Sequence, residues 1–243
     1  YFLSDDFGSA KVLCARIAEK TNTETPQSAL LALYRYLLLN QKFPLSAKDS
    51  TCKKILCCIN DYFETGVLNP KFDDIVAAYR MQIYNQDDPD EIYYVDILIA
   101  IIKEALEKTS RKLLPQYSNL DSETWASYFR NSNSMKLLWP SQQLIGEKGV
   151  LLGNNAIVQL PTGVGKTKSI ELIIRSAFLS NRVNSAVIVA PLRALCNEIV
   201  TDLTNVFESD VVINQFSDVL QDDFSFDFEN MLKKHIAVCT PEK

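Results

Sequence analysis

The sequence predicts an all-α region over residues 1–135, followed by an α/β domain with a parallel sheet over residues 136–243. Two observations carry this prediction. Before residue 131 apolar residues recur at helical spacing and no run alternates with period two, whereas after residue 138 short apolar runs alternate with amphipathic stretches. The polar stretch 131–134 is expected to separate the two, because Asn and Ser favour turns.

Several helices of the first region have recognisable starts. Thr25 is a good N-cap, and Pro26 suits the first helical position. The expected helices, out of five or six, run from Pro26 to about residue 40, from residue 46 or 49 to about 66, from residues 69–70 to about 83, and from residue 90 to about 108. The last has the clearest apolar stripe. The acidic residues 87–90 are interpreted as a cap and a solvated turn.

In the second region strands are expected at residues 156–160, 186–190, 211–213 and 236–239. Helices are expected from about Trp139, and at 167–179, 193–207 and 227–234. Short buried strands that alternate with amphipathic helices predict a parallel sheet covered on both faces.

The composition is that of a soluble globular protein, with 47% apolar and 23% charged residues. The longest apolar stretch, residues 95–102, contains Asp96 and is too short to span a bilayer. No leader follows Tyr1, so we expect a soluble cytoplasmic protein without membrane contact. The net charge of −5 argues against a surface that embraces nucleic acid as a whole. Any such contact would use a local groove and backbone N–H groups.

The cysteines and the histidine give no sign of a metal site. The six cysteines lack C-x-x-C spacing, and several have apolar neighbours, so buried free thiols are expected. His235 is the single histidine, and we interpret it as structural.

The stretch 160–167, Leu-Pro-Thr-Gly-Val-Gly-Lys-Thr, lies between an expected strand and an expected helix. This is the context that a phosphate-binding loop requires. Its glycines let backbone N–H groups turn toward phosphate oxygens, and the following helix N-terminus favours an anion. Lys166 would reach the β and γ phosphates of ATP, and the Thr167 hydroxyl would bind Mg²⁺. The candidate nucleotide-binding residues of the loop are Thr162, Gly163, Val164, Gly165, Lys166 and Thr167. The alternative is a plain strand-to-helix turn with a solvated Lys166.

Three further segments surround this loop: Gln142, Pro191-Leu192-Arg193 and Thr240-Pro241. Taken singly they would be a surface glutamine, a strand-to-helix loop and a helix start. Taken together with the loop, in which Leu160 replaces the first glycine of the general pattern, they resemble superfamily 2 helicases, in particular the DExH superkiller-like branch. The resemblance covers residues 138–243.

The resemblance implies a RecA-like ATP-binding domain of an ATP-dependent helicase or translocase. It implies that Gln142 reads the adenine edge and that Lys166 is catalytic. It also implies that two segments contact the backbone of single-stranded DNA or RNA, namely Pro191, Leu192, Arg193 and Thr240, Pro241. A Gly-Asp element that the family often has is replaced by Asn214-Gln215-Phe216-Ser217-Asp218. The family's Asp-Glu-x-His segment and second RecA-like domain would follow Lys243, so we expect a fragment that binds nucleotide without hydrolysing it.

Two other interpretations remain open for the sequence. One is a regulatory nucleotide-binding module whose helical domain recruits a protein partner. The other is an anti-phage role, because a helical domain joined to such a motor resembles the helicase subunit of the Hachiman system, with a nuclease as its partner.

Overall fold

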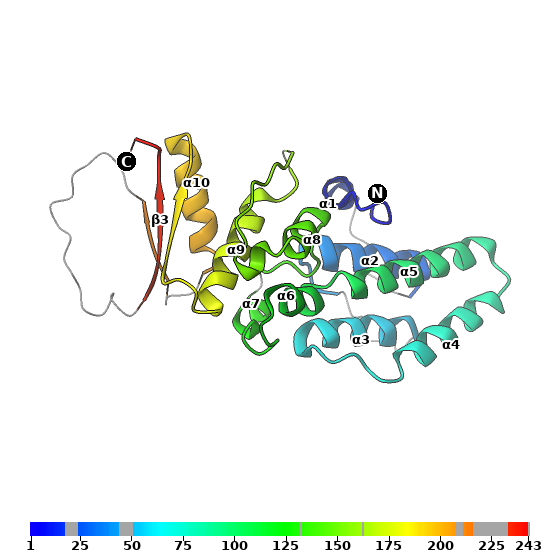
Figure 1. The fold of residues 1–243 in the computed structure, drawn as a ribbon. Coiled ribbons are helices and arrows are strands. Elements are labelled where there is room, and N and C mark those ends of the chain that lie inside the picture. The colour runs from blue at the N-terminus through cyan, green and yellow to red at the C-terminus, as the bar shows by residue number, and fades with distance from the viewer. Residues whose placement is uncertain are drawn as a thin grey trace. The chain divides into compact units, whose positions relative to one another are not determined.

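The computed structural model describes residues 1–17, 24–43, 51–131, 133–161, 163–207, 211–215 and 233–242. The chain divides into two compact units, whose elements are drawn in Figure 1. Unit 1 comprises Tyr1–Gln116 with Ala126–Gln143. Unit 2 comprises Tyr117–Trp125 with Leu144–Lys243.

Helices form the regular structure of unit 1 within its described residues. They are α1 (Phe7–Arg16), α2 (Pro26–Leu39), α3 (Thr51–Thr65), α4 (Phe72–Tyr84), α5 (Pro89–Glu107), most of α6 (Ser110–Ser118), α7 (Ala126–Arg130) and the first half of α8 (Pro140–Glu147). Helices α2 to α5 lie at the predicted places. The start predicted at residues 69–70 is displaced, because Lys71 is the N-cap of α4.

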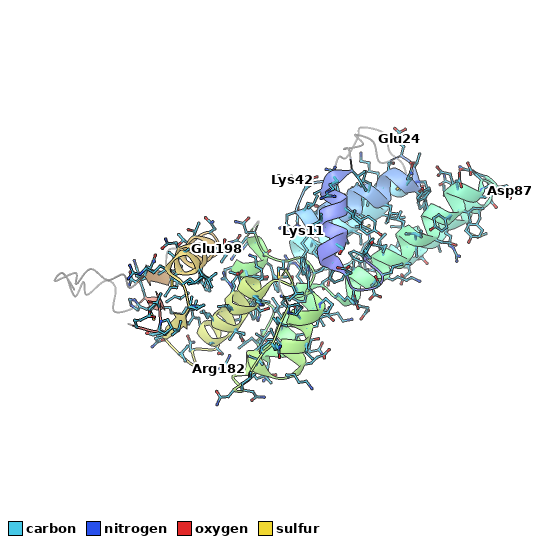
Figure 2. The ribbon with its side chains drawn as sticks, turned by 90° about the horizontal axis from the view of Figure 1, so that it is seen from above. Lys11, Glu24, Lys42, Asp87, Arg182 and Glu198 are labelled. Atoms are coloured by element: carbon cyan, nitrogen blue, oxygen red, sulfur yellow. The ribbon has the colours of Figure 1, made fainter. Side chains whose placement is uncertain are left out.

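The caps explain where α2 and α5 begin. Thr25 and Ser28 form a capping box at the start of α2, in which each side chain bonds the backbone N–H of the other. Asp88 caps α5 by accepting from the N–H groups of Asp90 and Glu91. Asp87 lies in the turn before it with φ of 55°, and Figure 2 shows its side chain at the tip between α4 and α5. The interpretation of this acidic cluster as a cap and a turn is therefore confirmed.

One apolar core fills unit 1. Helix α2 packs against α1, α3 and α5, and α4 packs against α3 and α5. Its fully buried side chains include Leu33, Ile55, Leu56 and Ile101. The apolar stripe of each helix thus finds a neighbouring helix.

Unit 2 contains the described strands. Its elements are the second half of α8, the 3₁₀ turn η1 (Val150–Leu152), α9 (Lys166–Leu179), β1 (Ser185–Val189), α10 (Arg193–Thr204), β2 (Val211–Gln215) and β3 (Lys234–Cys239). The strands form a parallel sheet in the order β1-β3-β2. The prediction of a parallel sheet is confirmed for these three strands.

Helices cover one face of this sheet within the described residues. Ile188, Ile236 and Val238 are buried against the apolar sides of α9 and α10. Val187 and Val189 point the other way along β1 and are 67% and 58% exposed. Helices on both faces, as predicted, are therefore not seen in the described part of unit 2.

The strand predicted at residues 156–160 is wrong. Residues 154–161 form no regular secondary structure, and Ile157 is fully exposed. A strand forms only where a neighbour offers hydrogen bonds, and the described sheet has no member beside this segment. The helix predicted at 227–234 falls mostly outside the described residues, and its last residue, Lys234, begins β3.

Candidate functional site

The loop that precedes α9 has the backbone conformation expected of a phosphate-binding loop. Gly163 and Gly165 have φ of +83° and +82°, which side-chain-bearing residues rarely adopt. Gly165 is the N-cap of α9, and no side chain caps the helix there. The first turn of α9 therefore presents its N–H groups and its positive dipole end to the loop.

The side chains at this turn complete a set of donors that fits a polyphosphate and a divalent metal. Lys166 is exposed and has no ion pair or hydrogen bond to any other described residue; Thr167 is half-buried. A Cβ built on Gly163 would meet no atom within 4 Å, so there is open space at the loop for a ligand. A cation, a hydroxyl and backbone N–H groups are the groups that hold phosphates and their metal. Thr162 lies outside the described residues.

The two segments expected at nucleic acid lie side by side. Pro191-Leu192-Arg193 follows β1, and Thr240-Pro241 follows β3, and these strands are parallel neighbours. The ladder extends past both strands, because the N–H of Ala190 donates to the carbonyl of Cys239 at 2.9 Å. The structure thus brings both segments to the carboxyl edge of the sheet, where open α/β sheets bind their ligands.

Glu242 adds a negative charge at this edge, and sequence reasoning assigned it no role. The pKa of its carboxyl lies below the ordinary value, first because the Thr240 hydroxyl donates a hydrogen bond to it, then because its own N–H does so. The positive charge of Arg193 lowers this pKa further. The Thr240 hydroxyl and the charge of Arg193 thus both act on the exposed Glu242 carboxylate.

A contact with β3 fixes the C-terminal end of α9. Lys234, the first residue of β3, donates to the carbonyl of Phe178 and, at 3.1 Å, to the Asn181 side chain. The C-terminal end of α9 is thus held at the amino edge of the sheet.

Gln142 belongs to a different unit from the other candidate site residues. It lies in the part of α8 that belongs to unit 1, and its side chain is only 1% exposed. The alternative of a surface glutamine is therefore wrong. Buried amides usually form hydrogen bonds. Burial of Gln142 therefore fits a structural amide and also an amide that would bind the adenine base.

Among the described residues no group of three or more His, Cys, Asp or Glu side chains could hold a metal ion. The six cysteines are free thiols, and four of them are buried. His235 lies in β3, and its N–H donates to the carbonyl of Asn184. No helix in the described part of the chain is long and apolar enough to cross a membrane.

Unit 2 thus combines a parallel sheet with a glycine loop and a helix that starts with Lys166 and Thr167, which is an α/β arrangement. Residues 140–243 match the family model of the DEAD/DEAH box helicases. This match supports the expected resemblance of this part of the chain to superfamily 2 helicases. The match, the parallel sheet and its helices fit an α/β RecA-like fold. Helicases of this family use ATP with Mg²⁺ and act on nucleic acids.

Proposed function

We propose that this chain is the nucleotide-binding part of an ATP-dependent motor that moves along single-stranded DNA or RNA. One observation carries the proposal most directly. The loop before α9 holds two left-handed glycines and leads into an N-terminus that no side chain caps. Lys166 and Thr167 stand in the first turn of that helix. Lys166 would bind the β and γ phosphates, and Thr167 would hold Mg²⁺, which offsets charge on the transferred phosphoryl group.

The carboxyl edge of the sheet supports the nucleic-acid part of the proposal. Arg193 supplies a charged donor, and Thr240 supplies a hydroxyl beside it. Together with N–H groups at the start of α10, these groups suit phosphates of a single strand without reading its bases. Such contacts position a backbone, which is what a motor requires.

Nucleic-acid-stimulated ATP hydrolysis by the full-length polypeptide tests this function. We expect Lys166→Ala to lower the rate of hydrolysis by about a hundredfold or more. A positioned lysine stabilises the negative charge that develops on the phosphates in the transition state, and removing such a group has an effect of this size. Lys148→Ala is the matched control, since Lys148 is an exposed lysine of the same unit. Hydrolysis that no nucleic acid stimulates, or that survives Lys166→Ala, would contradict the proposal.

We also propose the superkiller-like branch as the motor's relatives, and anti-phage defence as its setting. The support is the order of Gln142, the loop, Pro191-Leu192-Arg193 and Thr240-Pro241 along the chain, together with the helical elements that precede them. A nuclease encoded beside this protein, and retained by it in a pull-down, would support the setting. A protein that shows no effect on phage infection would count against it.

A further inference from the structure

Three charged side chains form a ladder along α9, which neither the nucleotide loop nor the carboxyl edge uses. Lys168, Glu171 and Arg175 are three and four residues apart, so they share one side of the helix. Lys168 Nζ lies 3.0 Å from Glu171 Oε2, and Arg175 Nη2 lies 3.7 Å from Glu171 Oε1.

The ladder is buried at two of its three positions. The side chains of Glu171 and Arg175 are 2% and 7% exposed, whereas Lys168 is 35% exposed. Replacing a buried ion pair by apolar residues often leaves stability unchanged or raises it. Stability alone therefore does not account for these charges in the core of unit 2.

Arg175 connects α9 to the segment that follows α10. Its Nη2 donates to the carbonyl of Val206 at 2.6 Å, and its guanidinium lies 4.4 Å from the centre of the Phe207 ring. Val206 is the second residue after Thr204, the last residue of α10, and the first residue of α10 is Arg193. Helix α10 thus joins Arg175 at one end to the Pro191-Leu192-Arg193 segment at the other.

The middle link of the ladder is open. Glu171 Oε1 is buried, accepts no hydrogen bond within the described part of the chain, and lies beyond hydrogen-bond distance of Arg175. A buried carboxylate oxygen in this state is costly. Because Arg175 is also held by the carbonyl of Val206, a small shift of the segment after α10 relative to α9 would move its guanidinium toward Glu171 and close this link.

We propose that Glu171 is a positioning residue that couples nucleotide binding at the loop to the nucleic-acid segment carried by α10. Lys168, the third residue of α9, joins the loop-bearing turn to Glu171. Nucleotide at the loop then biases the Glu171–Arg175 link, and through Arg175 the position of α10. The inference rests on the proposed function, because it requires both ligands.

Steady-state hydrolysis by the full-length polypeptide tests this coupling, with oligo(dT) and oligo(U) as single-stranded probes. Glu171→Gln keeps the shape of the side chain and removes its charge. We expect the unstimulated rate and the KM for ATP to stay within about twofold, while stimulation by the better probe falls about tenfold. Arg175→Lys should lose stimulation similarly, and the double variant should lose no more than either, because both act through one link. Glu198→Gln, on the exposed side of α10, is the matched control and should keep full stimulation.

Lys168→Met provides a second variant that leaves the buried part of the ladder in place, in case Glu171→Gln disturbs folding. It should also lose stimulation while the thermal midpoint stays at the wild-type value. Full stimulation in Glu171→Gln or Lys168→Met would overturn the coupling. So would a parallel loss of both rates with the thermal midpoint, which marks a merely structural role. A wild-type protein that neither probe stimulates would instead overturn the proposed function itself.

Discussion

The helices of unit 1 and the strands of unit 2 cover their apolar faces in different ways. In unit 1 the stripes of α2 and α5 face other helices, and side chains such as Ile101 are fully buried. In unit 2, Val187 on β1 and Ile157 before the loop are exposed. A helix satisfies its own backbone hydrogen bonds, whereas a strand depends on a neighbour for them. Within the described residues the stripes of α2 and α5 are therefore covered by other helices, whereas the outer face of β1 is not covered.

The largest effect that tests this contrast comes from truncating one apolar side chain in each unit. Ile101→Ala should lower the free energy of unfolding of unit 1 by about 2–5 kcal/mol, because it leaves a cavity in a packed core. Val187→Ala should cost unit 2 less than about 1 kcal/mol, because the side chain is exposed. Urea unfolding followed for each unit provides the two values. Similar costs for both variants would break the contrast and show that the outer face of β1 is covered in solution.

A smaller effect concerns a cation in unit 1. Lys136 Nζ donates to Asn40 Oδ1 at 2.8 Å and lies over the Tyr36 ring, and burial lowers its pKa to about 8. The cation Arg175 of unit 2, by contrast, has a carboxylate beside it. Between pH 8 and the ordinary value of 10.5 the unfolded chain holds the Lys136 proton and the folded chain does not. Stability from this group therefore rises with pH across that window.

Lys136→Met removes that contribution. Between pH 8 and pH 10 we expect the free energy of unfolding to rise less in the variant than in the wild type, by on the order of 1 kcal/mol. The difference between the two proteins is the quantity to measure, by urea unfolding at several pH values. Other groups titrate nearby, since burial raises the pKa of the Cys52 thiol to about 11 and lowers stability above pH 9 in both proteins. Identical pH slopes would show that Lys136 is solvated.

The helices that were predictable are those with a cap and a stripe. Thr25 and Asp88 mark the starts of α2 and α5, because each side chain accepts a hydrogen bond from a backbone N–H at most three residues further along. Helix α6 contains Pro115, which lacks a backbone N–H, so no local rule placed a helix there. Caps and apolar stripes in the sequence thus predicted the helices that depend on interactions between residues close together in the chain.

The remaining features depend on residues far apart in the chain. The apolar run 156–160 has the composition of a strand. Whether a strand forms depends on pairing with a neighbouring strand, about which composition carries no information. The conformation of the loop could be predicted, because the glycines that allow it and Lys166 lie within one stretch of eight residues. The burial of Arg175 could not be predicted, since Arg175 contacts Val206 and Phe207, some thirty residues further along the chain. Charged residues at helical spacing usually mark a solvated face, and here they mark a packed one.

The smallest expected effect lies at the carboxyl edge of unit 2, where the exposed charges have no counterpart in a packed core. The charges of Glu242 and Arg193 interact, so the Glu242 carboxylate lowers the net positive charge that a phosphate would meet. Glu242→Gln should therefore tighten the binding of single-stranded oligo(dT) about twofold to threefold, as expected for an exposed pair. The gain should shrink at higher salt, because screening weakens exposed charges. Fluorescence anisotropy at two salt concentrations measures it, with Glu198→Gln as a charge-matched control on α10. Weaker binding would show that the carboxylate is needed to orient Thr240, and that positioning at this edge outweighs repulsion.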